Sequence, residues 1–162
     1  MITTRSATLD DVERISALLM ANAADRGGTL YGDWSVGVVG GHIAAGDLII
    51  VAIDGPDLLG VLFTSEKARA SAPPVLAMLA AWPGSVDAYV YGPVCIDQAV
   101  RGKGVLEALY ADMVTRRPGR EAILFIKANN PRSLRAHARL GMAQVASFTL
   151  GGEVFAVLSD RN

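Results

Sequence analysis

The chain has 162 residues, of which 51% are hydrophobic and 19% charged, and its 15 basic and 16 acidic side chains give a formal net charge of −1. This composition excludes a disordered chain, and a charge so close to zero argues against nucleic-acid binding. The single cysteine excludes an internal disulfide, no apolar run approaches the roughly 20 residues of a membrane span, and the polar N-terminus lacks a signal-peptide core. We therefore expect one cytoplasmic domain over residues 1–162, without a membrane or nucleic-acid partner.

The first part of the chain predicts a strand, two helices and a hairpin. Val12, Ile15 and Leu19 are spaced so that one helix face is apolar, and the acidic pair Asp10-Asp11 suits the start of that helix. A glycine-rich loop over 25–33 and a second helix, weakened by three glycines, follow. The other expected elements are a strand at 1–7, the second helix at 34–45, and an antiparallel hairpin of strands at 48–53 and 58–64.

The second part alternates strands and helices. Residues 65–86 depart from strand character, and we interpret them as a connecting excursion with a short helix-like piece at 75–81. The order β-α-α-β-β-β-α-β-α-β-β predicts an α/β fold with a mixed central sheet of about seven strands and about four helices. The expected elements are strands at 88–96 and 122–127, helices at 104–115 and 131–140, and a closing hairpin of strands at 143–150 and 154–158.

A basic, glycine-rich turn joins the strand at 88–96 to the helix that follows it. The residues are Arg101-Gly102-Lys103-Gly104-Val105. A strand that passes through such a turn into a helix presents backbone N–H groups and a positive helix end to one point, which suits a phosphate or pyrophosphate. Taken alone, the turn indicates only that an anion can bind, and a simple turn with solvated charges is the other interpretation.

A second segment gives this turn a specific meaning. Arg101 to Gly104 resembles the pyrophosphate loop of the GNAT-type N-acetyltransferases, with the pattern Arg/Gln-x-x-Gly-x-Gly/Ala. About thirty residues later, Asn130-Pro131-Arg132-Ser133 runs through His137 to Gly141-Met142, which resembles the second signature of that family. The resemblance implies a single GNAT-like α/β domain, with the fourth and fifth strands splayed to admit acetyl-coenzyme A.

The same resemblance implies which residues hold that cofactor. The pyrophosphate would lie against the loop, where Leu106 departs from the usual Gly or Ala of the family. Main-chain groups of Val94 and Ile96 would pair with the pantetheine arm, and Asn130 and Ser133 would lie beside it. The expected pyrophosphate residues are Arg101, Gly102, Lys103, Gly104, Val105 and Leu106.

His137 stands where relatives often carry a tyrosine that protonates the departing thiolate. An imidazole is able to do this, because its ordinary pKa of about 6.5 lies near neutrality. His137 is therefore the candidate catalytic acid, and a histidine that only packs or hydrogen-bonds is the other interpretation. The position where many relatives carry a catalytic carboxylate reads Tyr91-Gly92-Pro93, so no general base is assigned.

Three aromatic residues are candidates for the acceptor pocket: Tyr31, Trp34 and Tyr91. The other interpretations are that Tyr31 and Trp34 are hydrophobic anchors and that Tyr91 pairs across the sheet. Cys95 lies in an apolar strand without a histidine tied to it by a motif, which favours a buried structural thiol over a nucleophile. Two histidines and one cysteine offer no metal-site spacing, so we expect no metal.

These expectations combine into one reaction. We expect direct transfer of an acetyl group to a primary amine of a small molecule or a protein, within a ternary complex that leaves coenzyme A as product. A homodimer is compatible with the apolar composition. The alternatives are a coenzyme-A-binding sensor or partner module without turnover, and an unrelated nucleotide-phosphate binder. The sequence argues against the nucleotide-phosphate binder, because no hydroxyl side chain follows Lys103 as it would in a P-loop.

Overall fold

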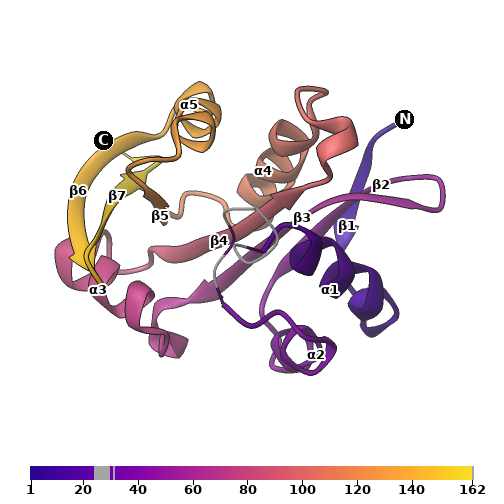
Figure 1. The fold of residues 1–162 in the computed structure, drawn as a ribbon, viewed down its shortest axis with the longest axis horizontal. Helices are drawn as coiled ribbons and strands as arrows, with labels where there is room; N and C mark the ends of the chain where they lie inside the picture. The colour runs from indigo at the N-terminus through magenta and orange to yellow at the C-terminus, as the bar shows by residue number, and fades with distance from the viewer. Residues whose placement is uncertain (24–29, 31, 162) are drawn as a thin grey trace. The chain divides into compact units, whose positions relative to one another are not determined.

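The computed structural model describes residues 1–23, 30 and 32–161, and in these ranges it has seven strands and five α-helices (Figure 1). The strand order in the sheet is β1-β2-β3-β4-β5-β7-β6. The strands are β1 Thr3–Ser6, β2 Ile49–Asp54, β3 Asp57–Glu66, β4 Tyr89–Ile96, β5 Ala122–Lys127, β6 Ala143–Leu150 and β7 Glu153–Ser159. The helices are α1 Val12–Ala21, α2 Val36–Ala44, α3 Pro73–Ala81, α4 Val105–Arg116 and α5 Pro131–Arg139.

The predicted fold class is confirmed. The sheet is mixed, because β4 pairs with β5 in parallel whereas β1 with β2, β2 with β3, and β5 with β7 pair antiparallel. The one difference is a fifth helix, α3, within the segment expected to be a connection. Pro73 and Pro74 open that helix, where prolines are tolerated because the first N–H groups of a helix have no partner within it. The splay of β4 from β5 stays a prediction.

The chain divides into two compact units, which are described one at a time. The first unit contains Met1–Thr64 and Gly92–Arg117, and the second contains Ser65–Tyr91 and Pro118–Asn162. Two of the three boundaries fall within β3 and β4, so each unit holds part of these two strands, and the third follows α4.

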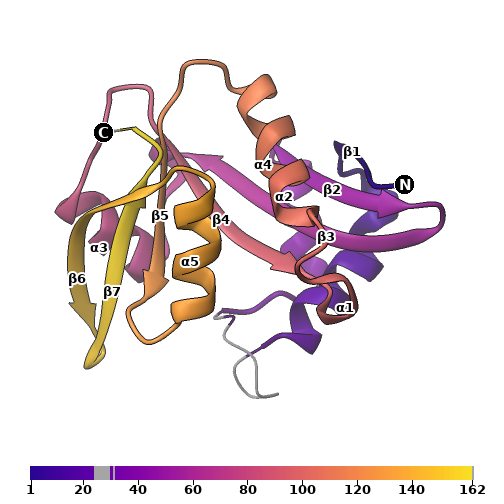
Figure 2. The same ribbon diagram turned by 90° about the horizontal axis from the view of Figure 1, so that it is seen from above.

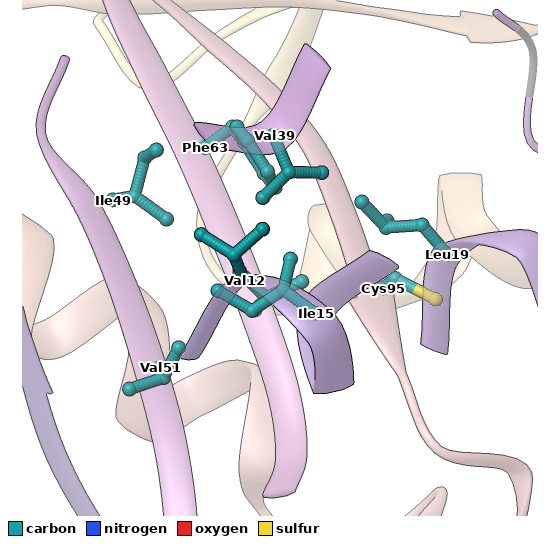
Figure 3. Close-up of a cluster of buried hydrophobic side chains, with 9 residues drawn as sticks. Val12, Ile15, Leu19, Val39, Ile49, Val51, Phe63 and Cys95 are labelled. Carbon is teal, nitrogen blue, oxygen red and sulfur yellow. The ribbon is translucent and has the colours of Figure 1, made fainter. Parts of the chain in front are cut away.

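In the first unit, helices α1 and α2 cover one face of the strands and α4 covers the other (Figures 1 and 2). The face under α1 and α2 is a buried apolar cluster, drawn in Figure 3. Its side chains alternate along the strands, which is why Val51, Val61 and Cys95 point to the same side. The cluster contains Val12, Ile15, Leu19, Val39, Ile49, Val51, Val61, Phe63 and Cys95.

In the second unit, α3 and α5 lie on opposite sides of β5 and β7 (Figures 1 and 2). The α3 side is a second apolar cluster that draws on three strands. Val90 of β4 belongs to this cluster, so the alternation of a strand directs its neighbour Tyr91 to the other side, where α5 lies. The buried members of the cluster are Met78, Ala88, Val90, Ile123 and Val157.

Each unit contains a buried carboxylate that ties its elements together. Asp11, before α1, accepts hydrogen bonds from Arg5 of β1 (2.7 and 2.9 Å), from Arg14 (2.8 Å) and from the backbone N–H of Thr8 (2.8 Å). Its side chain is 2% exposed. The bonds to Arg5, above all, hold the pKa of Asp11 well below its ordinary value, against the effect of burial.

Glu121, before β5, has the same role in the second unit. It accepts from Trp82 Nε1 (2.9 Å), from the N–H and hydroxyl of Ser85 (2.7 and 2.9 Å) and from Ser159 Oγ of β7 (2.6 Å). Burial raises the pKa of Glu121, but the bonds from Ser159, Trp82 and Ser85 outweigh it and lower the pKa to about 2. The carboxylate is therefore charged at neutral pH although it is buried.

No helix in the described ranges is both long enough and apolar enough to cross a bilayer. Among the same residues, no three His, Cys, Asp or Glu side chains gather in a way that could hold a metal ion.

Candidate functional site

The basic turn of the first unit lies between β4 and α4, after a short 3-10 helix at Gln98–Val100. Gly102 and Gly104 both have positive φ, +76° and +88°, and Gly104 is the residue that caps the start of α4. Residues with a Cβ rarely adopt this conformation, so the local structure requires glycine at both positions. A Cβ added to Gly102 would meet nothing within 4 Å, so the backbone of the turn is open.

Helix α4 directs at this turn N–H groups that have no acceptor within the helix. Its first helical bond runs from Ala108 N–H to Gly104 C=O at 3.1 Å. The three N–H groups before it, of Val105, Leu106 and Glu107, have no acceptor within the helix. With twelve residues, α4 also presents the positive end of its dipole here. The turn and the helix start together form a suitable site for an anion.

The charged side chains of the turn differ in their surroundings. Arg101 is half-buried and donates to Asn22 Oδ1 at 3.0 Å, so its guanidinium is fixed to the end of α1. Lys103 is exposed and carries positive charge into the solvent beside Gly102 and Gly104. Glu107 is also exposed, and its Oε2 lies 4.0 Å from where a Cβ of Gly104 would stand. The site therefore has one exposed cation and one opposing carboxylate.

The last residues of β4 lead into this turn. Val94 and Ile96 are half-buried, whereas Cys95 between them is buried in the cluster under α1 and α2. Burial raises the pKa of the Cys95 thiol to about 11, so the thiol is protonated at neutral pH. A Cβ on Gly60 of β3 would stand 2.9 Å from Ile96 Cδ1 and 3.1 Å from Cys95 C=O, so β3 approaches β4 closely at this point.

The second unit brings Asn130, Ser133 and His137 together on one side of α5. Asn130 caps the helix, and its side chain accepts from Ser133 N–H at 3.3 Å. His137 Nδ1 lies 2.9 Å from the Ser133 carbonyl oxygen and 3.4 Å from its hydroxyl. The spacing of three and seven residues predicts such a stripe, and the stripe is confirmed.

Tyr91 of β4 joins this group. Its hydroxyl lies 3.1 Å from His137 Nε2, and the two rings meet edge to face with centroids 5.5 Å apart. Both residues are 3% exposed. Burial lowers the pKa of His137, and the hydrogen bond to the Ser133 carbonyl acts in the opposite direction but more weakly. Both ring nitrogens of His137 therefore have a hydrogen-bonding partner, and burial disfavours the charged form of the ring.

The acceptor candidates are only partly described. Tyr31 lies outside the described residues. Trp34 stacks on His42 of α2, with ring centroids 5.7 Å apart, and packs against Phe63 at 5.2 Å. His42 Nδ1 donates to Asp47 at 2.9 Å. Sequence reasoning did not identify this contact of His42. Its partner Asp47 lies beyond the end of α2, so no helical spacing connects the two residues.

Two of the carboxylates near β4 in sequence already have structural roles. Glu66 forms two hydrogen bonds with Arg120, at 3.0 and 2.6 Å. Asp97 accepts from Ala99 N–H at 3.0 Å and so caps the short 3-10 helix.

The candidate site residues thus form two groups, one in each unit. The first contains the turn over 101–106 with Val94 and Ile96, and the second contains Tyr91 with Asn130, Ser133 and His137. Sequence reasoning missed the contact of Tyr91 with His137, since the two residues are 46 positions apart. The available signal was the alternation of β4, which turns Tyr91 away from Val90.

No family model and no curated protein matches this chain. Solved structures do. The chain is similar to an N-acetyltransferase from Staphylococcus aureus Mu50, at 16% identity and a TM-score of 0.72, over 98% of this chain and 97% of that one. It is similar to yncA from Salmonella typhimurium, solved with its cofactor acetyl-CoA, at 17% identity and a TM-score of 0.69, over 98% and 92%. It is also similar to a GNAT superfamily phosphinothricin acetyltransferase from Sinorhizobium meliloti in complex with AcCoA, at 17% identity and a TM-score of 0.72, over 98% and 86%. The chain has the fold of the GNAT-type N-acetyltransferases.

Proposed function

We propose that this protein is an acetyl-coenzyme-A-dependent N-acetyltransferase that acts on a primary amine. The observation that carries the proposal is the open glycine turn before α4, with its N–H groups that have no acceptor within the helix and its exposed lysine. The fold supports it, as does the acetyl-CoA in two of the similar structures.

The residues of the turn fit the diphosphate of that cofactor. The N–H groups of Val105, Leu106 and Glu107 supply donors, and the two glycines leave the backbone accessible. Lys103 adds charge, whereas Arg101 acts through the position it gives the turn, since it is fixed to Asn22. A cofactor of this kind supplies a thioester whose carbonyl carbon can accept a nucleophile.

The other candidate residues have proposed roles near the contact between the turn and the diphosphate. Main-chain groups of Val94 and Ile96 align the pantetheine arm, and the start of α5 at Asn130 and Ser133 lies beside it. Trp34, Tyr31 and Tyr91 are the residues that we propose for contacts with the acceptor. Positioning of the two reactants, rather than covalent catalysis by Cys95, provides the rate, in keeping with the raised pKa of the Cys95 thiol.

The acceptor is a small-molecule or protein amine, and we propose that the transfer is direct. An amine with an ordinary pKa near 10 has to lose a proton before it attacks. A cytoplasmic setting and a homodimer remain predictions.

Calorimetric titration of the purified protein with acetyl-coenzyme A tests the proposal, with ATP–magnesium as the control. We expect saturable one-to-one binding of acetyl-coenzyme A only, followed by release of thiol when a suitable amine from a panel is added. Binding of ATP–magnesium in preference to acetyl-coenzyme A would contradict the proposal. Binding of acetyl-coenzyme A without thiol release from any amine would favour the module without turnover.

Gly104→Val tests the turn itself. A β-branched side chain at φ +88° strains the backbone by about 1–2 kcal/mol and covers the helix start, so we expect loss of detectable acetyl-coenzyme A binding. Gly46→Val is the matched control, because Gly46 has φ +86° and open space but stands after α2. Urea denaturation should show a similar loss in the free energy of unfolding for Gly104→Val and Gly46→Val. Unchanged affinity in Gly104→Val would remove the turn as the site.

A further inference from the structure

Three arginines form a stripe along one side of α5, and Arg132, Arg135 and Arg139 are called the arginine stripe below. With 3.6 residues per helical turn, their side chains leave the helix within about 60° of one another. His137 is buried on the opposite side of α5, which faces the strands of the second unit (Figure 2). All three arginines are exposed, so the stripe faces away from the sheet.

The stripe differs from the other basic side chains of the second unit. In the described part of the chain, none of its three arginines has a hydrogen-bond, ion-pair or ring partner. By contrast, Arg120 pairs with Glu66 at 2.6 Å, and Lys127 pairs with Glu153 at 3.3 Å. The other basic side chains with a partner are Lys67, Arg69 and Arg161. The stripe is therefore where the positive charge of this unit is left uncompensated.

Helix stability does not account for these charges. The helix contains no acidic residue, and its arginines are spaced by three and four residues, where like charges repel. Arg132 also lies in the first turn, at the positive end of the helix dipole, where a cation is unfavourable. Only Arg139, in the last turn, suits the dipole. A negatively charged partner would turn this repulsion into attraction.

The chemistry and spacing of the stripe indicate which partner fits. A guanidinium can bind a carboxylate through two parallel hydrogen bonds. The Cα atoms of the stripe span about 10 Å along the helix, because each residue rises about 1.5 Å. In an extended peptide, side chains on one side follow one another at about 7 Å. Acidic residues at alternate positions of such a peptide can therefore face the stripe.

Two other anionic partners fit less well. Nucleic-acid binding relies on many phosphate contacts, whereas the second unit has only eight basic side chains against five acidic ones. A helix that lies on a membrane needs large apolar side chains beside its cations. In the described part of the chain, no exposed large hydrophobic residue belongs to α5.

We propose that the arginine stripe is a docking surface for an acidic segment of a partner protein, bound in extended form with Asp or Glu at alternate positions. The inference goes beyond the proposed function and does not depend on it, because the stripe binds its partner with or without acetyl-coenzyme A. Salt screens attraction between exposed charges, so the complex weakens as ionic strength rises.

Fluorescence polarisation without acetyl-coenzyme A tests this inference, with a labelled glycine-serine peptide that carries three glutamates at alternate positions. We expect saturable binding at low ionic strength. In the triple variant Arg132→Gln, Arg135→Gln and Arg139→Gln, called the stripe variant, affinity should fall about tenfold or more. Lysine at the same three positions keeps the charge but not the paired hydrogen bonds, so we expect a smaller loss of about threefold. Equal affinity of the stripe variant and the unaltered protein would overturn the inference.

The matched control removes the same charge from three exposed arginines that have partners, in the triple variant Arg69→Gln, Arg116→Gln and Arg161→Gln. Its affinity for the peptide should stay within about twofold of the unaltered protein. An equal loss in both triple variants would reveal only a general effect of net charge and contradict a docking surface on α5. Urea denaturation should show no lower free energy of unfolding for the stripe variant, because its substitutions remove like-charge repulsion.

Other occupants of the stripe give different results. If a single-stranded oligonucleotide or an anionic vesicle binds more tightly than the peptide and loses that affinity in the stripe variant, the inference is wrong. The same holds for a dimer in sedimentation that the stripe variant abolishes, and for a tenfold loss of acetyl-coenzyme A affinity in that variant. If the unaltered protein binds the peptide through the stripe but does not bind acetyl-coenzyme A, the proposed function fails and this inference stands.

Discussion

Glu107 places a carboxylate in the first turn of α4, beside the turn that we propose for the diphosphate. A negative charge there stabilises the helix by its dipole but repels an anionic ligand. In Glu107→Gln we therefore expect acetyl-coenzyme A to bind about two- to fivefold more tightly at low ionic strength, with the gain reduced at high salt. Calorimetric titration at two salt concentrations measures both effects.

Glu13→Gln is the matched control, because Glu13 is an exposed acid in the first turn of another helix, α1. It should change helix stability by a similar few tenths of a kcal/mol, with no change in affinity. Equal affinity in Glu107→Gln and the unaltered protein would mean that the diphosphate does not lie at this helix start.

Single residues also show where sequence reasoning stops. The spacing of Asn130, Ser133 and His137 predicts their shared face, because helical periodicity is a local property. The hydrogen bond between Tyr91 and His137 depends on how β4 and α5 pack within the second unit, and no local pattern contains that information. For this reason the sequence identifies His137 as a candidate acid but does not reveal its contact with Tyr91.

At the scale of elements, the close approach of β3 to β4 and α4 depends on Gly60. A Cβ at this position would stand 2.9 Å from Ile96 Cδ1, 3.0 Å from Val105 Cγ1 and 3.1 Å from the Cys95 carbonyl oxygen. The backbone oxygen cannot move aside as a side chain can. Gly60→Ala should therefore lower the free energy of unfolding by about 1–3 kcal/mol and weaken acetyl-coenzyme A binding, since Val105 begins the helix at the turn.

Urea denaturation and calorimetric titration of the same preparations test this prediction. Gly41→Ala is the control, for which we expect the opposite change in the free energy of unfolding. Gly41 lies inside α2 with nothing within 4 Å of an added Cβ. Alanine there should stabilise the protein by up to about 1 kcal/mol through helix propensity. Equal stability of Gly60→Ala and the unaltered protein would show that β3 can move away from β4 without cost.

The elements themselves were largely predictable, since hydrophobic periodicity and glycine or proline at their ends are local signals. The strand Ala122–Lys127 has the predicted bounds, and the hairpin β2–β3 turns at Gly55 and Pro56, between the two predicted strands. Helix α3 was expected only as a short piece at 75–81, because prolines are ambiguous between a turn and a helix start. The order of the strands in the sheet was not predicted, because it depends on contacts between segments that are distant in the sequence.

For the molecule as a whole, the proposal of one domain over 1–162 has a measurable consequence. The two buried carboxylates lie in different units, Asp11 in the first and Glu121 in the second. Both have a pKa below the ordinary value in the folded protein, so their stabilisation is present above the unfolded pKa of about 4 and is lost as pH falls. For Glu121 the loss runs from about pH 5 down to about 2 and amounts to roughly 2–3 kcal/mol.

At pH 7 the free energy of unfolding of Glu121→Gln, measured by urea denaturation, should therefore be about 2–3 kcal/mol lower than that of the unaltered protein. The difference should shrink as the pH approaches 2. Glu153→Gln is the control, because Glu153 is 46% exposed and pairs with Lys127 at 3.3 Å, a contact worth less than about 1 kcal/mol. If the difference in free energy of unfolding between Glu121→Gln and the unaltered protein stays constant down to pH 2, Glu121 is not the carboxylate whose protonation destabilises the protein.

Whether the two units unfold together can be measured because each contains one tryptophan, Trp34 in the first and Trp82 in the second. In a Trp34→Phe background, the fluorescence of Trp82 reports the second unit alone. Asp11→Asn, in the first unit, removes a charge that Arg5 and Arg14 need and should cost about 2 kcal/mol or more. If residues 1–162 form one cooperative domain, this substitution shifts the Trp82 transition by the same amount as the far-UV circular dichroism. A Trp82 transition that stays in place while the circular dichroism splits into two steps would show that the units unfold independently, and the single-domain proposal would be wrong.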